Sequence, residues 1–173
     1  MSLYYRIQSY FKLPIPIFFK KYLKKYFGKN ELDKKLKSFL NFNNGFYIEI
    51  GAFDGITQSN TYYYEKNNNW KGILIEPSKI QFDKCKFYRS KKNFFYNCAC
   101  VSFKFKKNFL KLHYSGLKTY SSKFLSQKLN KEYVKNPEIH RGEKKYSYYV
   151  KTITMNDILL KSNAPKIIDF LSL

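Results

Sequence analysis

Short apolar runs alternate with helix-length segments through the middle of this chain, and that alternation limits the folds open to it. Apolar, β-prone runs occupy Phe46–Ile50, 71–76 and 94–101. The segments 57–66 and 78–89, which separate them, have the lengths and end signals of helices. Strands that alternate with helices pair in parallel through right-handed crossovers. The pattern therefore predicts an α/β domain.

Composition supports a single folded domain of this kind. The chain has 173 residues, of which 44% are hydrophobic and 20% aromatic, and such a chain can bury a core. That content excludes a disordered polycation, although the formal net charge is +21. Three cysteines cannot form a disulfide framework, so we expect reduced thiols in a cytoplasmic protein.

Two further strands are predicted near the carboxyl end, over 146–153 and 167–173, with a helix over 154–160 that Thr154 caps. Most of the segment 102–150 is less regular and is left unassigned. The run 167–173 is apolar almost throughout, as in a parallel strand that is covered on both faces. Because the chain stops inside this run, we expect an incomplete domain that is truncated after its fourth core strand.

Residues 1–38 form a basic, aromatic extension, and the predicted domain occupies 39–173. Apolar residues at helical spacing predict a helix over 19–27 that Gly28 ends, and a second helix over 31–40. We favour an extension that packs on the domain with its lysines in water. The alternative is peripheral contact with an anionic membrane. We expect no transmembrane segment, because spanning a bilayer takes about 20 apolar residues.

A small-residue loop follows the first predicted strand, at the sheet edge where open α/β sheets bind ligands. Gly51 and Gly55 in this loop allow a ligand and the next helix to approach the backbone closely. Their Gly-x-x-x-Gly spacing differs from the Gly-x-Gly-x-x-Gly of dinucleotide sites, and no P-loop motif occurs. Taken alone, the loop is typical of a tight turn.

Glu76 ends the second predicted strand, at the same sheet edge as Gly51. A carboxylate at this position can accept hydrogen bonds from both hydroxyl groups of a ribose. Taken alone, Glu76 is typical of a solvated acid at a strand end. Together with the glycine loop, it favours a binding site for a nucleoside cofactor.

Three stretches of sequence form a recognisable set. They are Asn-Gly-Phe-Tyr-Ile-Glu-Ile-Gly-Ala-Phe-Asp-Gly at 44–55, Ser-Asn-Thr at 59–61 and Trp-Lys-Gly-Ile-Leu-Ile-Glu-Pro at 70–77. This set closely resembles the FkbM family of S-adenosylmethionine-dependent methyltransferases. Further matching stretches are 97–99, 115–117, 152–159 and 168–173. The resemblance implies a class I methyltransferase fold, which is a Rossmann-like, mostly parallel sheet with helices on both faces.

The resemblance also implies S-adenosylmethionine as the cofactor. The cofactor-binding residues that it implies are Glu49, Gly51, Ala52, Asp54, Gly55, Glu76, Cys98 and Ala99. By the resemblance, Glu49 and the glycine loop line the methionine end, Glu76 holds the ribose, and Cys98 and Ala99 lie near the adenine. Asp54 matches the motif without an assigned role. The family methylates oxygen, so the expected acceptor is a hydroxyl group of a sugar, a glycosylated or polyketide product, or another small molecule.

No catalytic base is assigned, although a sugar hydroxyl is a weak nucleophile that usually needs a base or a metal. His113 and His140 lie in the weakly patterned region and are expected to be surface or structural residues. The family continues from the strand at 167–173 into Asp-x-Glu-Gly-x-Glu, and this chain ends directly before that motif. Cys98 and Cys100 are expected to be buried thiols rather than metal ligands, so no metal site is predicted.

Two other functions stay open at the level of sequence. A net charge of +21 together with many aromatic residues also suits nucleic-acid binding or RNA methylation. Lysines dominate these cations and are spread along the chain, as AT-biased coding would produce, which weakens this alternative. The remaining alternative is a non-catalytic fragment that keeps half of a cofactor site.

Overall fold

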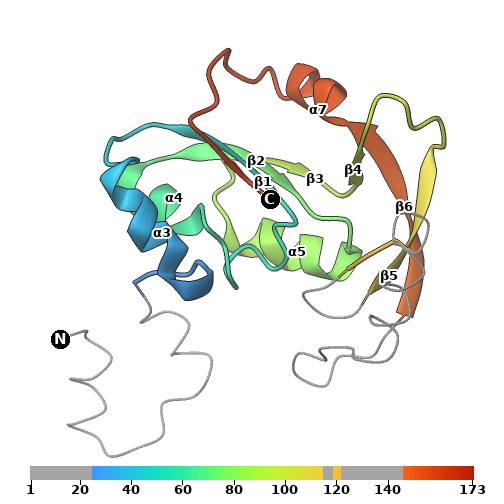
Figure 1. Cartoon of the computed structure of the whole chain (residues 1–173), viewed down its shortest axis with the longest axis horizontal. Coiled ribbons are helices and arrows are strands. Elements are labelled where there is room, and N and C mark those ends of the chain that lie inside the picture. Colours follow the sequence, from blue (N-terminus) through green and yellow to red (C-terminus); the bar gives the residue numbers. More distant parts are fainter. Residues whose placement is uncertain (1–24, 115–118, 122–145) are drawn as a thin grey trace, which may run out of the picture.

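The computed structural model describes residues 25–114, 119–121 and 146–173, and its centre is a four-stranded sheet (Figure 1). In spatial order its strands are β3 (Phe94–Tyr96), β2 (Lys71–Ile75), β1 (Phe46–Ile50) and β7 (Phe170–Ser172). Every neighbouring pair in this sheet is parallel. The order and the direction of the strands confirm the predicted α/β fold of the Rossmann-like class.

Alternate side chains of β1 and β2 point to opposite faces of this sheet, and an apolar cluster covers each face. Tyr47 and Leu74 pack on one face, together with α4 (Tyr62–Asn68) and α5 (Lys79–Tyr88). Ile48 and Ile73 pack on the other face, together with α7 (Met155–Lys161). Figure 1 shows α4 and α5 below the sheet and α7 above it. Helices therefore cover both faces, as predicted.

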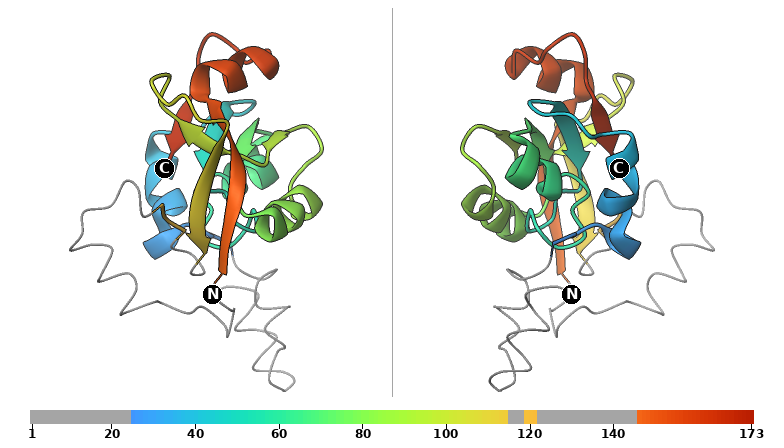
Figure 2. Two further views of the ribbon diagram at one scale, coloured as in Figure 1. Left: turned by 90° about the vertical axis from the view of Figure 1, so that its right-hand side faces the viewer. Right: turned by 90° about the vertical axis from the view of Figure 1, so that its left-hand side faces the viewer.

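A second, three-stranded sheet lies beside the first. Its strands, in spatial order, are β4 (Ala99–Val101), β6 (Tyr146–Thr154) and β5 (Phe109–Tyr114). Strands β5 and β6 run side by side in the left view of Figure 2. The prediction of one continuous strand over 94–101 is wrong, because the chain leaves the first sheet at Asn97. Its side-chain amide donates hydrogen bonds to the carbonyl oxygens of Glu76 at 2.8 Å and Pro77 at 3.0 Å. These bonds hold Asn97 at the end of β2, where the chain turns into the second sheet.

The predicted helix over 57–66 begins later than expected, at Tyr62. Gln58 has a φ of 59°, in the left-handed region, so the chain cannot be helical there. The residues that follow form a loop around a buried carboxylate that is described below. The strands predicted over 46–50, 71–76 and 146–153 and the helices predicted over 78–89 and 154–160 agree with the structure in type, and the strand predicted over 167–173 is limited to Phe170–Ser172. Thr154 caps α7 as predicted, since its Oγ1 accepts a hydrogen bond from the N–H of Asp157.

The described part of the N-terminal extension packs against the face that carries α4. Its helical turns are η1 (Lys29–Glu31), α3 (Leu32–Lys35) and η2 (Leu36–Ser38), close to the helix predicted over 31–40. The ring of Tyr26 stacks on Tyr63 with centroids 4.9 Å apart, and Phe27 meets Tyr62 edge-on at 4.8 Å. Aromatic packing therefore ties this segment to the domain.

Most of the helix predicted over 19–27 lies outside the described residues, and its described end from residue 25 onward is not helical. At Gly28 the chain instead forms an isolated parallel bridge with Gln58. In the parts of the chain that the structure describes, every helix is too short or too polar to cross a membrane.

Candidate functional site

A cavity of about 870 Å³ opens at the carboxyl ends of β1 and β2, at the edge where the sequence predicts a ligand site. The predicted site residues that line it are Glu49, Gly51, Ala52, Glu76, Cys98 and Ala99. Asp54 and Gly55 lie behind this wall. A concave site of this size is typical of small-molecule and cofactor binding.

The loop after β1 folds tightly against β2. The N–H groups of Gly51 and Ala52 both donate to the carbonyl oxygen of Ile75, at 2.9 and 3.0 Å. Gly51 has a φ of +77°, and a Cβ added to it would meet nothing within 4 Å. The backbone at Gly51 therefore faces open space at the cavity wall, where a ligand can approach it closely.

Glu76 is a buried carboxylate at the end of β2, with 5% of its surface exposed. Its Oε2 accepts a hydrogen bond from the N–H of Phe53, and its Oε1 accepts one from the N–H of Ser78, both at 2.8 Å. Each oxygen keeps acceptor capacity for a further donor. Burial raises the pKa of Glu76 to about 7, against the effect of these two bonds. A ligand that donates hydroxyl groups to Glu76 would stabilise its charged form.

Asp54 and Gly55 shape the loop from behind. Asp54 Oδ1 accepts hydrogen bonds from the N–H groups of Ile56 at 2.9 Å and Thr57 at 2.6 Å. Gly55 has a φ of +82°, and a Cβ added to it would lie 2.8 Å from Cγ of Arg89. Gly55 thus allows close packing of the loop on Arg89, at the end of α5. That Asp54 and Gly55 bind the cofactor stays a prediction.

Glu49 of β1 is the second buried carboxylate that lines the cavity. Its Oε2 accepts hydrogen bonds from the hydroxyl groups of Ser59 at 2.9 Å and Thr61 at 2.5 Å. Its Oε1 accepts a hydrogen bond from the N–H of Asn60 at 3.2 Å. The Ser-Asn-Thr motif of the sequence therefore folds around Glu49, which explains why α4 starts only after it.

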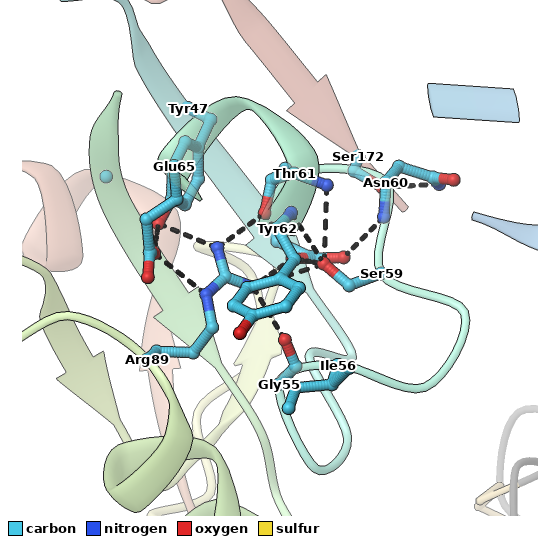
Figure 3. Close-up of polar contacts among 12 residues, drawn as sticks. Tyr47, Gly55, Ile56, Ser59, Asn60, Thr61, Tyr62, Glu65, Arg89 and Ser172 are labelled. Carbon is cyan, nitrogen blue, oxygen red and sulfur yellow. Dashed lines mark hydrogen bonds and ion pairs between the residues drawn. The ribbon is translucent and has the colours of Figure 1, made fainter. Parts of the chain in front are cut away.

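Arg89, which the sequence analysis does not single out, is the cation among these buried groups (Figure 3). Its side chain has no exposed surface. Its Nε donates to Oε2 of Glu65 at 2.8 Å, and its Nη1 donates to Oε2 of Glu49 at 3.2 Å. Nη1 also donates to the carbonyl oxygen of Gly55 at 2.9 Å. In a lysine-rich sequence, an arginine at a helix end is typical of a solvated cation, so no local pattern marks its burial.

An apolar wall closes the cavity towards the second sheet. The apolar residues of this wall are Cys98, Ala99, Val101, Phe105, Leu110 and Leu112. Burial raises the pKa of the Cys98 thiol to about 12, so the thiol stays neutral and behaves as an apolar group. An uncharged, apolar surface next to Glu76 suits the face of a purine ring.

Segments far apart in the sequence complete the cavity. Lys29 and Leu32 from the N-terminal turns line it, as does Ser172 from β7. Nδ2 of Asn60 donates to Oγ of Ser172 at 3.0 Å, which joins the loop before α4 to β7. Residues on both sides of the predicted boundary between 38 and 39 therefore line the same cavity, and the boundary itself stays a prediction.

Among the described residues, no histidine lines this cavity. Nδ1 of His113 lies 2.8 Å from the hydroxyl oxygen of Ser147, and the ring of His113 stacks on Tyr120. His113 is not among the lining residues, and His140 lies outside the described part of the chain. Within the described residues, no three histidine, cysteine or acidic side chains are grouped so that they could hold a metal ion.

Comparison with known proteins gives one match. A sequence model of the methyltransferase FkbM domain matches residues 49–173. Neither a curated protein nor a solved structure matches the chain. The matched range contains Glu49, the glycine loop, Glu76 and Arg89, and it also covers β7.

Proposed function

This chain belongs to the FkbM methyltransferase family, and on that basis we propose that it transfers a methyl group from S-adenosylmethionine to a hydroxyl oxygen. The proposed acceptor is carbohydrate-like, or a glycosylated or polyketide product. The observation that carries the proposal is the buried Glu76 carboxylate, which lines the cavity. A buried carboxylate needs donors, and the adjacent hydroxyl groups of a ribose supply two.

The cavity supports this donor along its whole length. The apolar wall from Cys98 to Leu112 suits the adenine, and Glu76 suits the ribose. The open space at the backbone of Gly51 leaves room for the methionine part of the donor, which is attached to the ribose. Glu49 adds a carboxylate at the cavity wall, where a cationic amine of the donor can bind.

When bound, S-adenosylmethionine supplies an electrophilic methyl group that passes to the acceptor oxygen by in-line displacement. The contribution of this chain is to hold the donor in one orientation, because positioning lowers the barrier of a reaction between two bound molecules. Glu76 and the loop around Gly51 fix the adenosine. No proton transfer is assigned to a side chain.

A transfer assay with methyl-labelled S-adenosylmethionine tests the proposal. The acceptors are neutral oligosaccharides, a glycosylated polyketide and RNA, each offered separately. We expect label in a hydroxyl-bearing carbohydrate or polyketide, as a methyl ether that resists mild alkali. Lys79→Gln, which removes only an exposed ion pair with Asp83 on α5, is the matched control and should transfer as the wild type does.

The outcomes separate the alternatives. Label in RNA would contradict the proposed acceptor and favour the RNA methyltransferase. Label that mild alkali releases would indicate a methyl ester on a carboxylate rather than an ether. If no acceptor is labelled, the result would contradict the proposed methyltransferase activity and favour a non-catalytic role.

A further inference from the structure

Arg89 is shared between two buried carboxylates that differ in what they face. Glu65 lies on α4, behind the loop, and accepts the shorter contact with the guanidinium, at 2.8 Å against 3.2 Å for Glu49. Glu49 lines the cavity, and Glu65 does not. The same cation therefore joins a carboxylate on the cavity wall to one in the interior.

Glu65 accepts hydrogen bonds from buried donors besides Arg89, as Glu49 does from Ser59, Asn60 and Thr61. Its Oε2 also accepts hydrogen bonds from the hydroxyl of Tyr47 at 2.7 Å and from Nδ2 of Asn93 at 2.6 Å. Its Oε1 accepts a hydrogen bond from the N–H of Ser90 at 2.8 Å. Although burial opposes ionisation, Arg89 and these donors lower the pKa of Glu65. Glu65 therefore shares the charge of Arg89 with Glu49.

The charges in this cluster do not cancel. One guanidinium faces two carboxylates, and each carboxylate is at least nine-tenths removed from solvent. If both are ionised, the cluster carries one excess negative charge, and Glu49 is the member that reaches the cavity. A buried, uncompensated charge is costly unless a ligand of opposite charge completes it. The cluster is therefore arranged to receive a cation at Glu49.

Arg89 also anchors the loop that carries the site. Its Nη1 donates to the carbonyl oxygen of Gly55 and to Oγ of Ser59, at 2.9 and 3.1 Å. Its Nη2 donates to Oγ1 of Thr61 at 2.8 Å. Ser59 and Thr61 are the same hydroxyl groups that bind Glu49. A single side chain therefore contacts the loop at three residues and also contacts the carboxylate.

We propose that Arg89 and Glu65 are positioning residues for donor binding, which hold Glu49 in place and leave it the negative charge that binds the cationic amine of the donor. This inference rests on the proposed function and deepens it. It assigns amine recognition to a cluster on three elements rather than to Glu49 alone. Arg89 sets the geometry, and Glu65 sets how much of the charge of Glu49 is left for the ligand.

Two probes separate this role from general support of the fold. S-adenosylhomocysteine carries the amino-acid group, whereas 5′-methylthioadenosine has the same adenosine without it. The variants are Arg89→Lys, which keeps the charge but loses the planar fork, and Glu65→Gln, which removes the competing anion. Lys79→Gln on the surface of α5 is the matched control. Calorimetry gives each Kd, and thermal unfolding checks that each variant is folded.

We expect both variants to weaken S-adenosylhomocysteine binding by about tenfold or more, the size of one charge-assisted hydrogen bond. Binding of 5′-methylthioadenosine should stay within about twofold of the wild type, because its contacts lie at Glu76 and the apolar wall. The control should change neither value. Each variant tests the inference separately, so a failure of one to fold leaves the other decisive.

Two results would overturn the inference. Equal weakening of both probes would show that the cluster supports the cavity as a whole. Unchanged binding of S-adenosylhomocysteine in a folded variant would show that the amine does not depend on the cluster. Failure of the wild type to bind either probe is a different result, because it would remove the proposed function itself.

Discussion

The backbone N–H of Phe53 donates a hydrogen bond to Oε2 of Glu76 at 2.8 Å. This bond joins the loop after β1 to the end of β2, so the two strand ends form one wall. The same carboxylate accepts a second backbone bond from Ser78, which starts the next helix. Glu76 is therefore fixed by the backbone on both sides before any ligand arrives, and a ligand finds its oxygens already oriented.

The pH dependence of donor binding should follow Glu76. Its pKa of about 7 means that the free protein holds it mostly protonated below neutrality. Ribose hydroxyl groups donate to the charged form, so binding expels the proton and affinity rises with pH. We expect the Kd of S-adenosylhomocysteine to fall about tenfold from pH 6 to pH 8, with little change above. Calorimetry over this range measures it, and a flat profile would contradict the assignment.

The same carboxylate should give the free protein a stability slope of defined sign. Because burial raises the pKa of Glu76 from its ordinary 4.5 to about 7, the native state binds more protons than the unfolded state between these values. Stability contributed by Glu76 therefore falls as pH rises through this window. Denaturant titrations of the wild type and Glu76→Ala should show a difference that shrinks towards pH 8. A difference that grows with pH would mean that the charged form is the stabilised one.

Gly51 and Gly55 should respond differently to alanine. Each has positive φ, so alanine adds about 1–2 kcal/mol of backbone strain at either position. At Gly55 the new Cβ would also lie 3.1 Å from Cα of Cys85, and the total cost should reach about 3 kcal/mol or more. At Gly51 the Cβ enters open space at the cavity wall, so Gly51→Ala should weaken donor binding more than it weakens the fold. Urea unfolding and calorimetry on both variants compare the two effects, and the reverse ranking would contradict this account.

The cysteines should differ in reactivity. Cys85 and Cys98 have 1% and 0% of their surface exposed, and burial raises the pKa of each thiol to about 12. Cys100 is partly exposed and lines the cavity. Iodoacetamide at pH 8 should therefore label Cys100 first, and S-adenosylhomocysteine should slow that labelling. Mass spectrometry of the labelled peptides decides it, and ligand-independent labelling of Cys100 would place the donor elsewhere.

Asp33 should hold the N-terminal turns on the domain. It is fully buried, and its Oδ2 accepts a hydrogen bond from the N–H of Phe27 at 2.6 Å. Asp33→Ala leaves that N–H without its partner, at a cost of about 1–3 kcal/mol. Trypsin should then cleave after Lys29 faster than in the wild type. The control is Glu31→Gln, an exposed acid two residues away, and equal cleavage of both variants would contradict the role of Asp33.

The sequence predicted the part of the site that lies at the ends of β1 and β2, because local sequence patterns mark those strand ends. Gly51 follows a strand and Glu76 ends the next strand, and parallel strands bring their carboxyl ends to one edge. Their proximity is therefore a consequence of strand order alone. The family resemblance added Cys98 and Ala99, which also line the cavity.

What the sequence did not predict depends on contacts across the fold. Arg89 is buried only because Glu49, Glu65 and Tyr47 converge on it from two other elements. The break after β3 depends on Asn97 reaching the carbonyl oxygen of Glu76. Neither contact leaves a periodic signal in the sequence, so hydrophobic patterning could not reveal it.

The central claim is that the ends of β1 and β2 bind S-adenosylmethionine through Glu76. Calorimetry with S-adenosylmethionine on the wild type, Glu76→Ala, Gly51→Val and the Lys79→Gln control tests it most directly. We predict binding by the wild type and the control, and at least about tenfold weaker binding by Glu76→Ala and Gly51→Val, since each loses or blocks contacts with the adenosine. Equal affinity in all four proteins would contradict the account.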